Sequence, residues 1–404
     1  MERKTDFLVF ATISSIIIFS ITLWRTLLPL YLDFKGLKPW EIGISVSLVM
    51  NLGLLLAFAS GYVVDLIDWR KSAMLAVLLL LMATLLLLFA QNFIEFLALA
   101  FITGFSTSLI TQASVKVLVK SSIEKRGLLY SSYMLLSNLG RIAASYLSGF
   151  ITAAYGYSML FMFSAATLLP IFGLLAHGDS SRKDRLTISE ASMRKVLKLY
   201  LRDTRLKILV SALFLHDFSV FIGIPYLVLY AKYVIGLDEV GVGILTGTRS
   251  LSQLVFQLGS GWLADKIGGS LTLATHFLTM SLAYIAYSNT KQFLDALLIY
   301  AFMGFAITLD LPARRLLITK YAPEEYVAAI NGFADTIAGL GAMLSAAIGG
   351  YLWDINPSLP IFAAGVANLS TLPPILYLKH RKRSFQNIKL KPEDISDKSW
   401  RFQS

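Results

Sequence analysis

Eight ionisable side chains stand inside long segments of the sequence that are otherwise apolar enough to enter a lipid bilayer. They are Arg25, Arg141, His216, Asp217, Arg249, His276, Asp310 and Asp335. A charged group near the bilayer centre costs at least about 2.5–3.5 kcal/mol on insertion scales, so each of these residues is a candidate functional residue. We expect the Arg and Asp residues to bind a solute or to couple its movement to an ion.

Arg141 and Arg249 fall near the middle of their segments. Two guanidinium groups at that depth can hold an anionic group through bidentate hydrogen bonds. They can equally pair with Asp217, Asp310 or Asp335 as structural ion pairs. A carboxylate in this setting can also exchange a proton, because burial favours its neutral form and a neighbouring Arg favours its charged form. The sequence leaves these alternatives open.

The remaining ionisable residues have more ordinary interpretations. Arg25 stands in the outer half of its segment, from which it can extend to the interface. His216 lies about 100° around its helix from Asp217, so the two side chains need not touch, and we expect His216 to be a packed core residue. His276 is expected to be a lipid-side or packing residue. Asp310 stands two residues before Pro312, which interrupts a helix, so Asp310 is our preferred gating or coupling residue.

Composition identifies the elements that must position these residues. The chain has 404 residues, of which 56% are hydrophobic and 15% charged, whereas a soluble protein has about 25% charged residues. Twelve stretches are long and apolar enough to cross a bilayer of about 30 Å. They are 7–32, 40–64, 72–91, 94–117, 128–153, 157–175, 208–233, 240–264, 271–288, 293–319, 327–353 and 359–378. The sequence therefore predicts an all-α membrane protein with twelve transmembrane helices.

The distribution of positive charge orients these spans. If the N-terminus is cytoplasmic, 29 of the 36 Lys and Arg residues fall in cytoplasmic loops and tails, and four fall in external loops. This bias predicts a multi-pass protein of the cell membrane with both termini in the cytoplasm. The net charge of +11 then reflects topology and contact with anionic lipid, and it gives no support for a nucleic-acid partner. The first span is too long for a signal peptide, so we expect it to be retained.

The two halves of the sequence align when one is shifted by 200 residues. The matched pairs are Gly36 with Gly236, Gly43 with Gly243, Asp65 with Asp265, Gly104 with Gly304 and Gly149 with Gly349. Because each half has six spans, the halves enter the membrane in the same orientation and form parallel repeats. We therefore expect two six-helix bundles, 1–177 and 208–378, whose interface holds the solute site.

A charged segment, 178–207, joins the two bundles, and a basic tail, 379–404, follows the second. In the linker, Thr187 and Glu190 have the spacing of a capping box. An apolar stripe follows opposite a basic face and predicts an amphipathic helix on the cytoplasmic leaflet, with a solvated linker as the alternative. The stripe comprises Met193, Val196, Leu197, Tyr200 and Leu201.

A short motif recurs after the second and the eighth span. The first copy contains Gly61, Asp65 and Arg70, and the second contains Gly261, Asp265, Lys266 and Gly268. Glycine allows helices to approach closely and the chain to reverse. An Asp at a helix end can accept hydrogen bonds from a neighbouring helix N-terminus or pair with a base.

This motif resembles the signature loop of the major facilitator superfamily, which has Gly, three residues, Asp, a basic residue, any residue, Gly and then basic residues. The first copy has Leu66, Asp68 and Trp69 in place of some of these, and the second lacks the trailing basic residues. The resemblance implies two bundles that alternate between outward-open and inward-open states. It also implies that Asp65 and Asp265 belong to latches between the bundles. The fifth span lacks the Pro of many drug/proton antiporters of this family.

These observations predict a secondary active transporter that moves a small solute by alternating access and is coupled to protons. The alternatives are efflux of amphipathic compounds by proton antiport and, in another class, a membrane receptor or sensor. The sequence has no Walker loop, no HExxH motif and no Cys, so we expect neither an enzyme nor a cofactor or metal site. We expect the protein to be a monomer.

Overall fold

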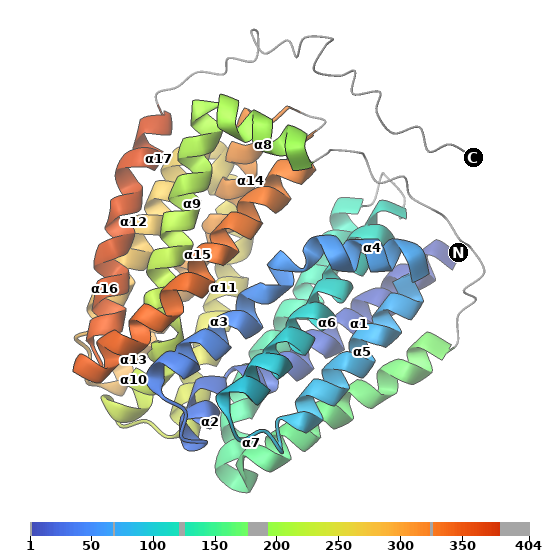
Figure 1. The fold of residues 1–404 in the computed structure, drawn as a ribbon, viewed down its shortest axis with the longest axis vertical. Coiled ribbons are helices and arrows are strands. Elements are labelled where there is room, and N and C mark those ends of the chain that lie inside the picture. Colours follow the sequence, from blue (N-terminus) through green and yellow to red (C-terminus); the bar gives the residue numbers. More distant parts are fainter. Residues whose placement is uncertain (1, 68, 121–125, 177–192, 324–325, 380–404) are drawn as a thin grey trace.

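The computed structural model describes residues 2–67, 69–120, 126–176, 193–323 and 326–379, and within these ranges its regular structure is entirely helical (Figure 1). The helices of the first half are α1 (Glu2–Arg25), α2 (Leu28–Phe34), α3 (Pro39–Leu55), α4 (Ala57–Ile67), α5 (Trp69–Leu86), α6 (Phe93–Lys120) and α7 (Arg126–Ala176). Those of the second half are α8 (Met193–Arg202), α9 (Thr204–Gly223), η2 (Ile224–Tyr226), α10 (Leu227–Tyr233), α11 (Glu239–Ile267), α12 (Gly269–Tyr287), α13 (Phe293–Thr308), α14 (Asp310–Tyr321), α15 (Val327–Ile355), α16 (Leu359–Asn368), η4 (Leu369–Thr371) and α17 (Leu372–Lys379).

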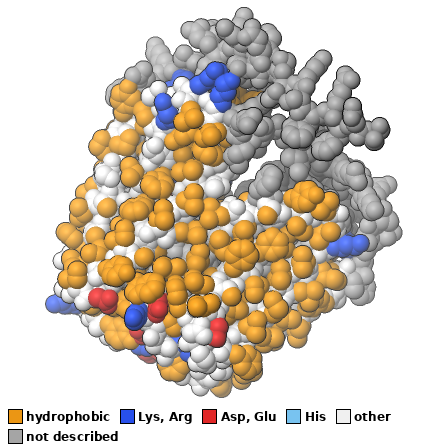
Figure 2. All heavy atoms as spheres, viewed as in Figure 1, with side chains coloured by type: hydrophobic (Ala, Val, Ile, Leu, Met, Phe, Trp, Pro, Cys, Tyr) orange, Lys and Arg blue, Asp and Glu red, His pale blue; other side chains and the backbone are white. Residues whose placement is uncertain are grey.

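Seven helical stretches of the described residues are long and apolar enough to cross a membrane. An eighth results if α1 and α2, which are bent by 40°, count as one span. The expected fifth and sixth spans both lie within α7, whose helical path is broken at Gly156 with φ 79° and ψ 174°. Figure 2 shows apolar side chains over most of the visible face of the molecule, with charged side chains towards its ends. This pattern is typical of a protein surrounded by lipid.

Three helix breaks fall beside prolines, and the sequence predicts the one at Pro312. Pro29 follows the bend between α1 and α2, and Pro225 lies in η2 between α9 and α10. Pro312 lies in the first turn of α14, just after the break at Leu309. Proline lacks an N–H donor and its ring clashes with the preceding turn, so a helix bends or ends there. The breaks at Pro29 and Pro225 occupy similar places in the two halves, and the loops that follow turn at Gly36 (φ 78°) and Gly236 (φ 81°).

Two seams join the first-half helices α1–α7 to the second-half helices α9–α17. In one seam α3 packs against α15, and in the other α7 packs against α11. The repeat of 200 residues relates α3 to α11 and α7 to α15, so the two seams are equivalent. Both depend on glycine: a Cβ on Gly43 would lie 2.2 Å from Oη of Tyr226, and one on Gly149 would lie 2.3 Å from the Glu239 carbonyl oxygen.

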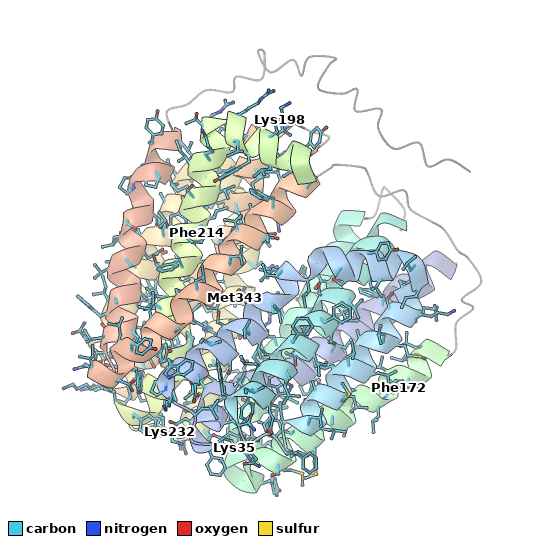
Figure 3. All side chains as sticks on the ribbon, in the orientation of Figure 1. Lys35, Phe172, Lys198, Phe214, Lys232 and Met343 are labelled. Carbon is cyan, nitrogen blue, oxygen red and sulfur yellow. The ribbon has the colours of Figure 1, made fainter. Side chains whose placement is uncertain are left out.

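Contacts across the seams gather towards one end of the molecule. At that end Tyr233 donates a hydrogen bond to Asp33, and Gly350 lies against the backbone of Trp40. Further along, Asn138 Nδ2 donates to Gln257 Oε1 at 2.7 Å. Lys35 and Lys232 lie at this end and Lys198 lies at the other (Figure 3).

Towards the opposite end the two groups of helices diverge (Figure 1). Trp262, near the end of α11, is 62% exposed, and Tyr62 on α4 is 58% exposed. A Cβ on Gly259 or Gly261 would have no neighbour within 4 Å among the described residues. The molecule is therefore closed at the Asp33–Tyr233 end and open at the end where α4 and α11 finish.

The expected amphipathic helix of the linker is α8, and its buried face differs from the predicted stripe. Val196 and Leu199 are buried against the apolar core of the second half, and Tyr200 packs on Phe333 with ring centroids 5.2 Å apart. Leu197 and Leu201 are 43% and 57% exposed. Because α8 packs on protein as well as facing outwards, its buried face is set by that contact. Thr187 and Glu190 lie outside the described residues.

Candidate functional site

The three interior carboxylates come together in the second half of the chain. Asp217 lies on α9, Asp310 at the start of α14 and Asp335 on α15, and their side chains are 19%, 24% and 22% exposed. Between them lies the guanidinium of Arg314, whose side chain is only 8% exposed. We call these four residues and Arg315 the acidic cluster.

Arg314 contacts all three carboxylates of the acidic cluster. Its Nη2 lies 3.0 Å from Oδ2 of Asp310 and 3.7 Å from Oδ1 of Asp217, and its Nη1 lies 3.8 Å from Oδ1 of Asp335. Arg315 donates from Nη2 to Oδ2 of Asp335 at 2.9 Å and from Nη1 to the side chain of Asn331. The cluster thus has three carboxylates and two guanidinium groups.

The break between α13 and α14 positions this cluster. It places Asp310 in the first turn of α14, where the helix dipole favours a carboxylate. Arg314 follows four residues later on the same face, which is the spacing of a helical ion pair. Pro312 removes the hydrogen bond that would continue α13 through this region, so one short helix presents both charges to α9 and α15.

The sequence alone did not indicate Arg314 and Arg315 as partners. Both fall in the last turns of the predicted tenth span, 293–319, where their charges are counted with the cytoplasmic loop that follows. In the structure α14 continues to Tyr321, so these residues lie two turns inside the helix. The spacing of Asp310 and Arg314 was the available signal. All three carboxylates contact Arg314, a partner that the sequence analysis did not consider for them.

The other three interior Arg residues form a second group of like charge. Arg141 on α7 and Arg249 on α11 lie close enough to Arg25 on α1 to act electrostatically on its guanidinium. Arg249 also lies over the ring of Tyr300, with its Cζ 5.8 Å from the ring centroid. All three side chains are half-buried. Arg25 is therefore within the electrostatic range of two other interior guanidinium groups.

His216 was expected to be a packed core residue, and His276 a lipid-side or packing residue. Both are buried, and they touch each other. His276 is 2% exposed and hydrogen-bonds the Ala306 carbonyl, so it faces protein and not lipid. His216 Nε2 lies 3.9 Å from Oδ1 of Asp217, which joins the histidines to the acidic cluster. The described residues include no group of three or more His, Cys, Asp or Glu side chains that could hold a metal ion.

The motif residues lie at the open end. Asp265 and Lys266 are exposed, and Lys266 Nζ lies over the ring of Trp262 at 4.7 Å. Gly268 has φ 85° and ends α11, which explains the glycine in this copy of the motif. In the first copy Gly61 lies near Gln112, and Arg70 stacks on Trp69 at 4.9 Å. The side chain of Asp65 lies outside the described residues.

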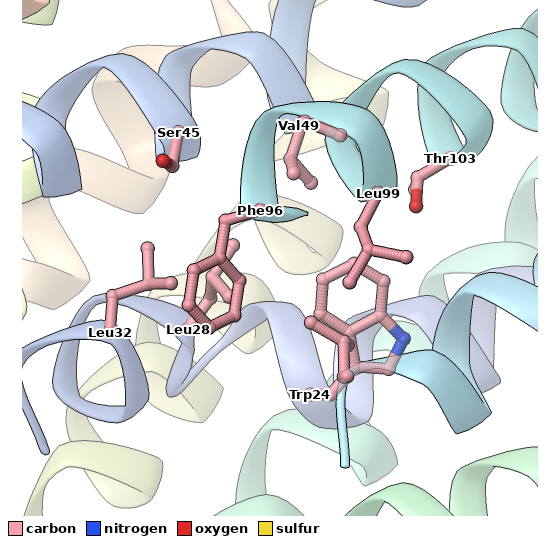
Figure 4. Close-up of a pocket in the computed structure, with 10 residues that line it drawn as sticks. Trp24, Leu28, Leu32, Ser45, Val49, Phe96, Leu99 and Thr103 are labelled. Atoms are coloured by element: carbon pink, nitrogen blue, oxygen red, sulfur yellow. The ribbon is translucent and has the colours of Figure 1, made fainter. Parts of the chain in front are cut away.

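A small apolar pocket lies within the first half. Trp24, Leu28, Val49, Phe96 and Leu99 contribute to its walls, together with Ser45 and Thr103 (Figure 4). Its volume of about 10 Å³ is comparable to that of one water molecule. The indole N–H of Trp24 and the hydroxyl of Ser45 have no hydrogen-bond partner among the described residues. This pocket is too small for an organic solute.

A helical membrane protein whose halves meet along two equivalent seams, with charged residues in its interior, has the architecture of a solute transporter. The sequence matches the family model of the Major Facilitator Superfamily over residues 7–240 and 209–401. The chain belongs to the major facilitator superfamily. Its family and relatives are transporters, so the prediction that it is not an enzyme is confirmed.

Two relatives illustrate the similarity in sequence. The quinolone resistance protein NorA of Staphylococcus aureus is 26% identical over 201 residues, which cover 48% of this chain and 51% of NorA. The match therefore spans about half the length of NorA. An MFS-type transporter of Yersinia enterocolitica is 24% identical over 294 residues, which cover 71% of this chain and 74% of that protein.

Solved structures show the same fold at low sequence identity. A POT family transporter in complex with 5-aminolevulinic acid has a TM-score of 0.74 at 12% identity, covering 92% of this chain and 96% of its own. The nucleoside transporter NupG has a TM-score of 0.75 at 12% identity, covering 93% of this chain and 99% of its own.

Proposed function

We propose that the protein is a secondary active transporter of the cell membrane that moves a small solute by alternating access, coupled to protons. It has twelve transmembrane helices in two six-helix bundles, 1–177 and 208–378, with the linker 178–207 and the tail 379–404 in the cytoplasm. It acts as a monomer, and its basic loops contact anionic lipid. The relatives support transport, and the distribution of Lys and Arg supports the orientation.

The observation that carries this proposal is that the two bundles touch at one end and diverge at the other. With both termini in the cytoplasm, Asp33 and Tyr233 lie on the external side, and Asp265 lies on the cytoplasmic side. The structure then corresponds to an inward-open state. Transport requires the seams to rock, closing the end at Trp262 and opening the end at Tyr233. Asp65 and Asp265 would latch the cytoplasmic end in the outward-open state, together with Gly61, Arg70, Gly261, Lys266 and Gly268.

Arg25, Arg141 and Arg249 are the candidate residues for binding the solute. Arg141 and Arg249 act on the charge of Arg25, so three like charges lie in one region and repel one another. An anionic group of the solute would offset this repulsion and accept bidentate hydrogen bonds from the guanidinium groups. Asp217, Asp310 and Asp335 are the candidate coupling residues, since each combines partial burial with a neighbouring Arg.

Reconstitution into proteoliposomes tests this function. The panel contains organic carboxylates, phosphate monoesters, neutral nucleosides and hydrophobic cations, each assayed with and without a pH gradient. We expect a gradient to drive accumulation of an anionic solute and Arg249→Gln to reduce it tenfold or more. Asp295→Asn, at the exposed start of α13, is the matched control and should behave as the wild type. If no solute moves and none raises the melting temperature, the proposal fails.

Efflux of amphipathic compounds by proton antiport is the second candidate, and the similarity to NorA favours it. It predicts that hydrophobic cations are moved, that transport survives Arg249→Gln, and that Asp310→Asn abolishes it. The same proteoliposomes therefore separate the two candidates, because the anion carrier depends on Arg249 and the efflux pump does not.

A further inference from the structure

Two buried histidines of the second half face each other through their Nε2 atoms. Nε2 of His216 on α9 lies 3.1 Å from Nε2 of His276 on α12, and the rings meet edge to face with centroids 4.8 Å apart. Their exposed fractions are 4% and 2%. Phe277 stacks on the ring of His216 at 4.5 Å, which excludes water from that face. A nitrogen pair at 3.1 Å is a hydrogen bond only if one nitrogen carries the hydrogen.

The Nδ1 atoms of both rings must be hydrogen-bond donors. Nδ2 of Asn368 donates to the Phe277 carbonyl at 2.9 Å and to Oγ of Ser281 at 3.0 Å, so the amide oxygen is the atom that faces His216. That oxygen lies 2.7 Å from Nδ1 of His216 and accepts its hydrogen. Nδ1 of His276 lies 2.8 Å from the Ala306 carbonyl oxygen, which is also only an acceptor.

Two neutral rings with hydrogens on Nδ1 would present two lone pairs to each other at 3.1 Å, which is repulsive. A single additional proton between the Nε2 atoms converts this repulsion into a charge-assisted hydrogen bond. We propose that His216 and His276 share one proton, so that the pair carries one positive charge, and that this is the proton exchanged during transport. The second part rests on the proposed function, whereas the first does not.

Burial and Arg314 oppose an additional charge on the pair, and Asp310 favours it. The groups that face the pair are an amide from α16, a carbonyl from α13, a guanidinium and a carboxylate from α14, and a carboxylate from α9; these are Asn368, Ala306, Arg314, Asp310 and Asp217. Asp335 of α15 reaches the pair only through Arg314. The acidic cluster has three carboxylates but two guanidinium groups. One imidazolium balances the remaining negative charge, so the whole assembly is neutral without a bound ion.

Asp217 provides a route for the proton. Its Oδ1 lies 3.9 Å from Nε2 of His216, and its side chain is 19% exposed, against 5% for the histidine. In the transfer, the N–H bond of the imidazolium breaks and an O–H bond forms on Asp217, so the ring becomes neutral and the carboxylate becomes a carboxylic acid. The acid then loses the proton to water. The two Nε2 lone pairs now repel each other, which favours separation of α9 from α12 and couples proton release to helix movement.

Nitrogen NMR of the full-length protein in detergent, labelled with ¹⁵N-histidine, tests the shared proton without any transport assay. The sequence has four His residues, and the single substitutions His216→Gln and His276→Gln assign the two signals of the pair. At pH 7 we expect scalar coupling between the two Nε2 atoms through one hydrogen. Two unprotonated Nε2 atoms, or an Nδ1 without hydrogen in either ring, would overturn the proposal.

Proteoliposomes test the role of this proton in transport. We expect His276→Gln and Asp217→Asn to reduce accumulation driven by a pH gradient tenfold or more, and to reduce solute exchange at equal pH much less. Asp217→Asn leaves both rings in place, so the hydrogens on the two Nδ1 atoms should persist in its nitrogen spectrum, which shows that the variant is folded. Thr279→Ala, one turn along α12 from His276, is the control and should accumulate solute as the wild type.

Accumulation at the wild-type level in both variants would show that the shared proton is not the transported one. If the wild type itself moves no solute, the proposed function fails, and the NMR result still decides whether the histidines share a proton.

Discussion

Arg314 donates from Nη2 to Oδ2 of Asp310 at 3.0 Å, one helical turn earlier on α14, and its other contacts reach Asp217 and Asp335 on two different helices. A single buried guanidinium therefore connects α9, α14 and α15. Removing it would leave three carboxylates in a half-buried site with only Arg315 as a cationic partner in the cluster.

The first prediction concerns this guanidinium. Arg314→Gln should lower the free energy of unfolding by about 3–5 kcal/mol, because breaking a buried ion pair leaves a charge uncompensated. Arg315→Gln is the matched control: its side chain is 42% exposed, so its loss should cost no more than about 1 kcal/mol. Thermal unfolding in detergent, followed by fluorescence, measures both. Equal melting temperatures for the two variants would contradict a central role for Arg314.

A disulfide across one seam should stop transport. Cβ of Leu54 lies 3.8 Å from the position of a Cβ on Gly339, which is within the separation of about 3.5–4.5 Å that a disulfide requires. The natural chain has no Cys, so Leu54→Cys with Gly339→Cys introduces the only pair. We expect oxidation to abolish flux and reduction to restore it. The two single-Cys variants are the controls, and full flux in the oxidised double variant would contradict rocking at this seam.

Close packing at the same seam gives a third prediction. A Cβ on Gly43 would meet Oη of Tyr226 at 2.2 Å and the Ala346 carbonyl oxygen at 2.4 Å. Gly43→Val should therefore push α3 away from α15 and reduce transport tenfold or more, with an overpacking cost of about 1–3 kcal/mol in stability. Gly259→Ala is the control, since its Cβ meets no described atom within 4 Å. Flux and melting temperature are measured together, and wild-type values for Gly43→Val would show that the seam tolerates a wider spacing.

Asp203 links stability to pH outside the membrane. It caps the N-terminus of α9 by accepting from the Arg205 backbone N–H at 2.8 Å and from the Arg205 guanidinium at 2.7 Å. Burial raises the pKa of Asp203, but the hydrogen bonds from Arg205 outweigh it and hold the pKa below its ordinary value of 3.8. A lowered pKa means that the folded state favours the ionised carboxylate. The stabilisation is therefore complete above the ordinary pKa of the unfolded state, and it is lost as the pH falls through the lowered pKa of the folded state.

Asp203→Ala should accordingly cost about 0.5–2 kcal/mol at pH 7, the usual loss for a helix cap. Its melting temperature should approach that of the wild type as the pH falls from about 5 to 3. Asp203→Asn keeps a capping side chain and should show a smaller deficit at pH 7. A deficit that stays constant over this range would exclude the ionised carboxylate as its cause.

The sequence predicted the features that depend on composition and on the repeat. Glycines matched at the offset of 200 residues, such as Gly43 and Gly243, lie in the equivalent seams, because close helix approach requires the same residue in both halves. Pro312 predicted the helix break before α14. The grouping of Asp217, Asp310 and Asp335 was not predictable, because it depends on how α9, α14 and α15 are rotated. The sequence left open whether His276 faces lipid or packs against protein. The answer depends on the face of α12 on which His276 lies, and that face is turned towards His216.

The glycine contacts of the two seams affect how easily one bundle can move against the other. Gly43, Gly149, Gly243 and Gly350 bring bare backbone against atoms of the other half, so at these four positions the seam surfaces carry no side chain of their own. Smooth surfaces of this kind slide past each other with little resistance, and the repeat makes that resistance similar on both sides. We therefore expect the preferred orientation of the bundles to be set by interactions at the two ends of the molecule and by the charges between the bundles. Small changes in these interactions should be enough to reverse the orientation.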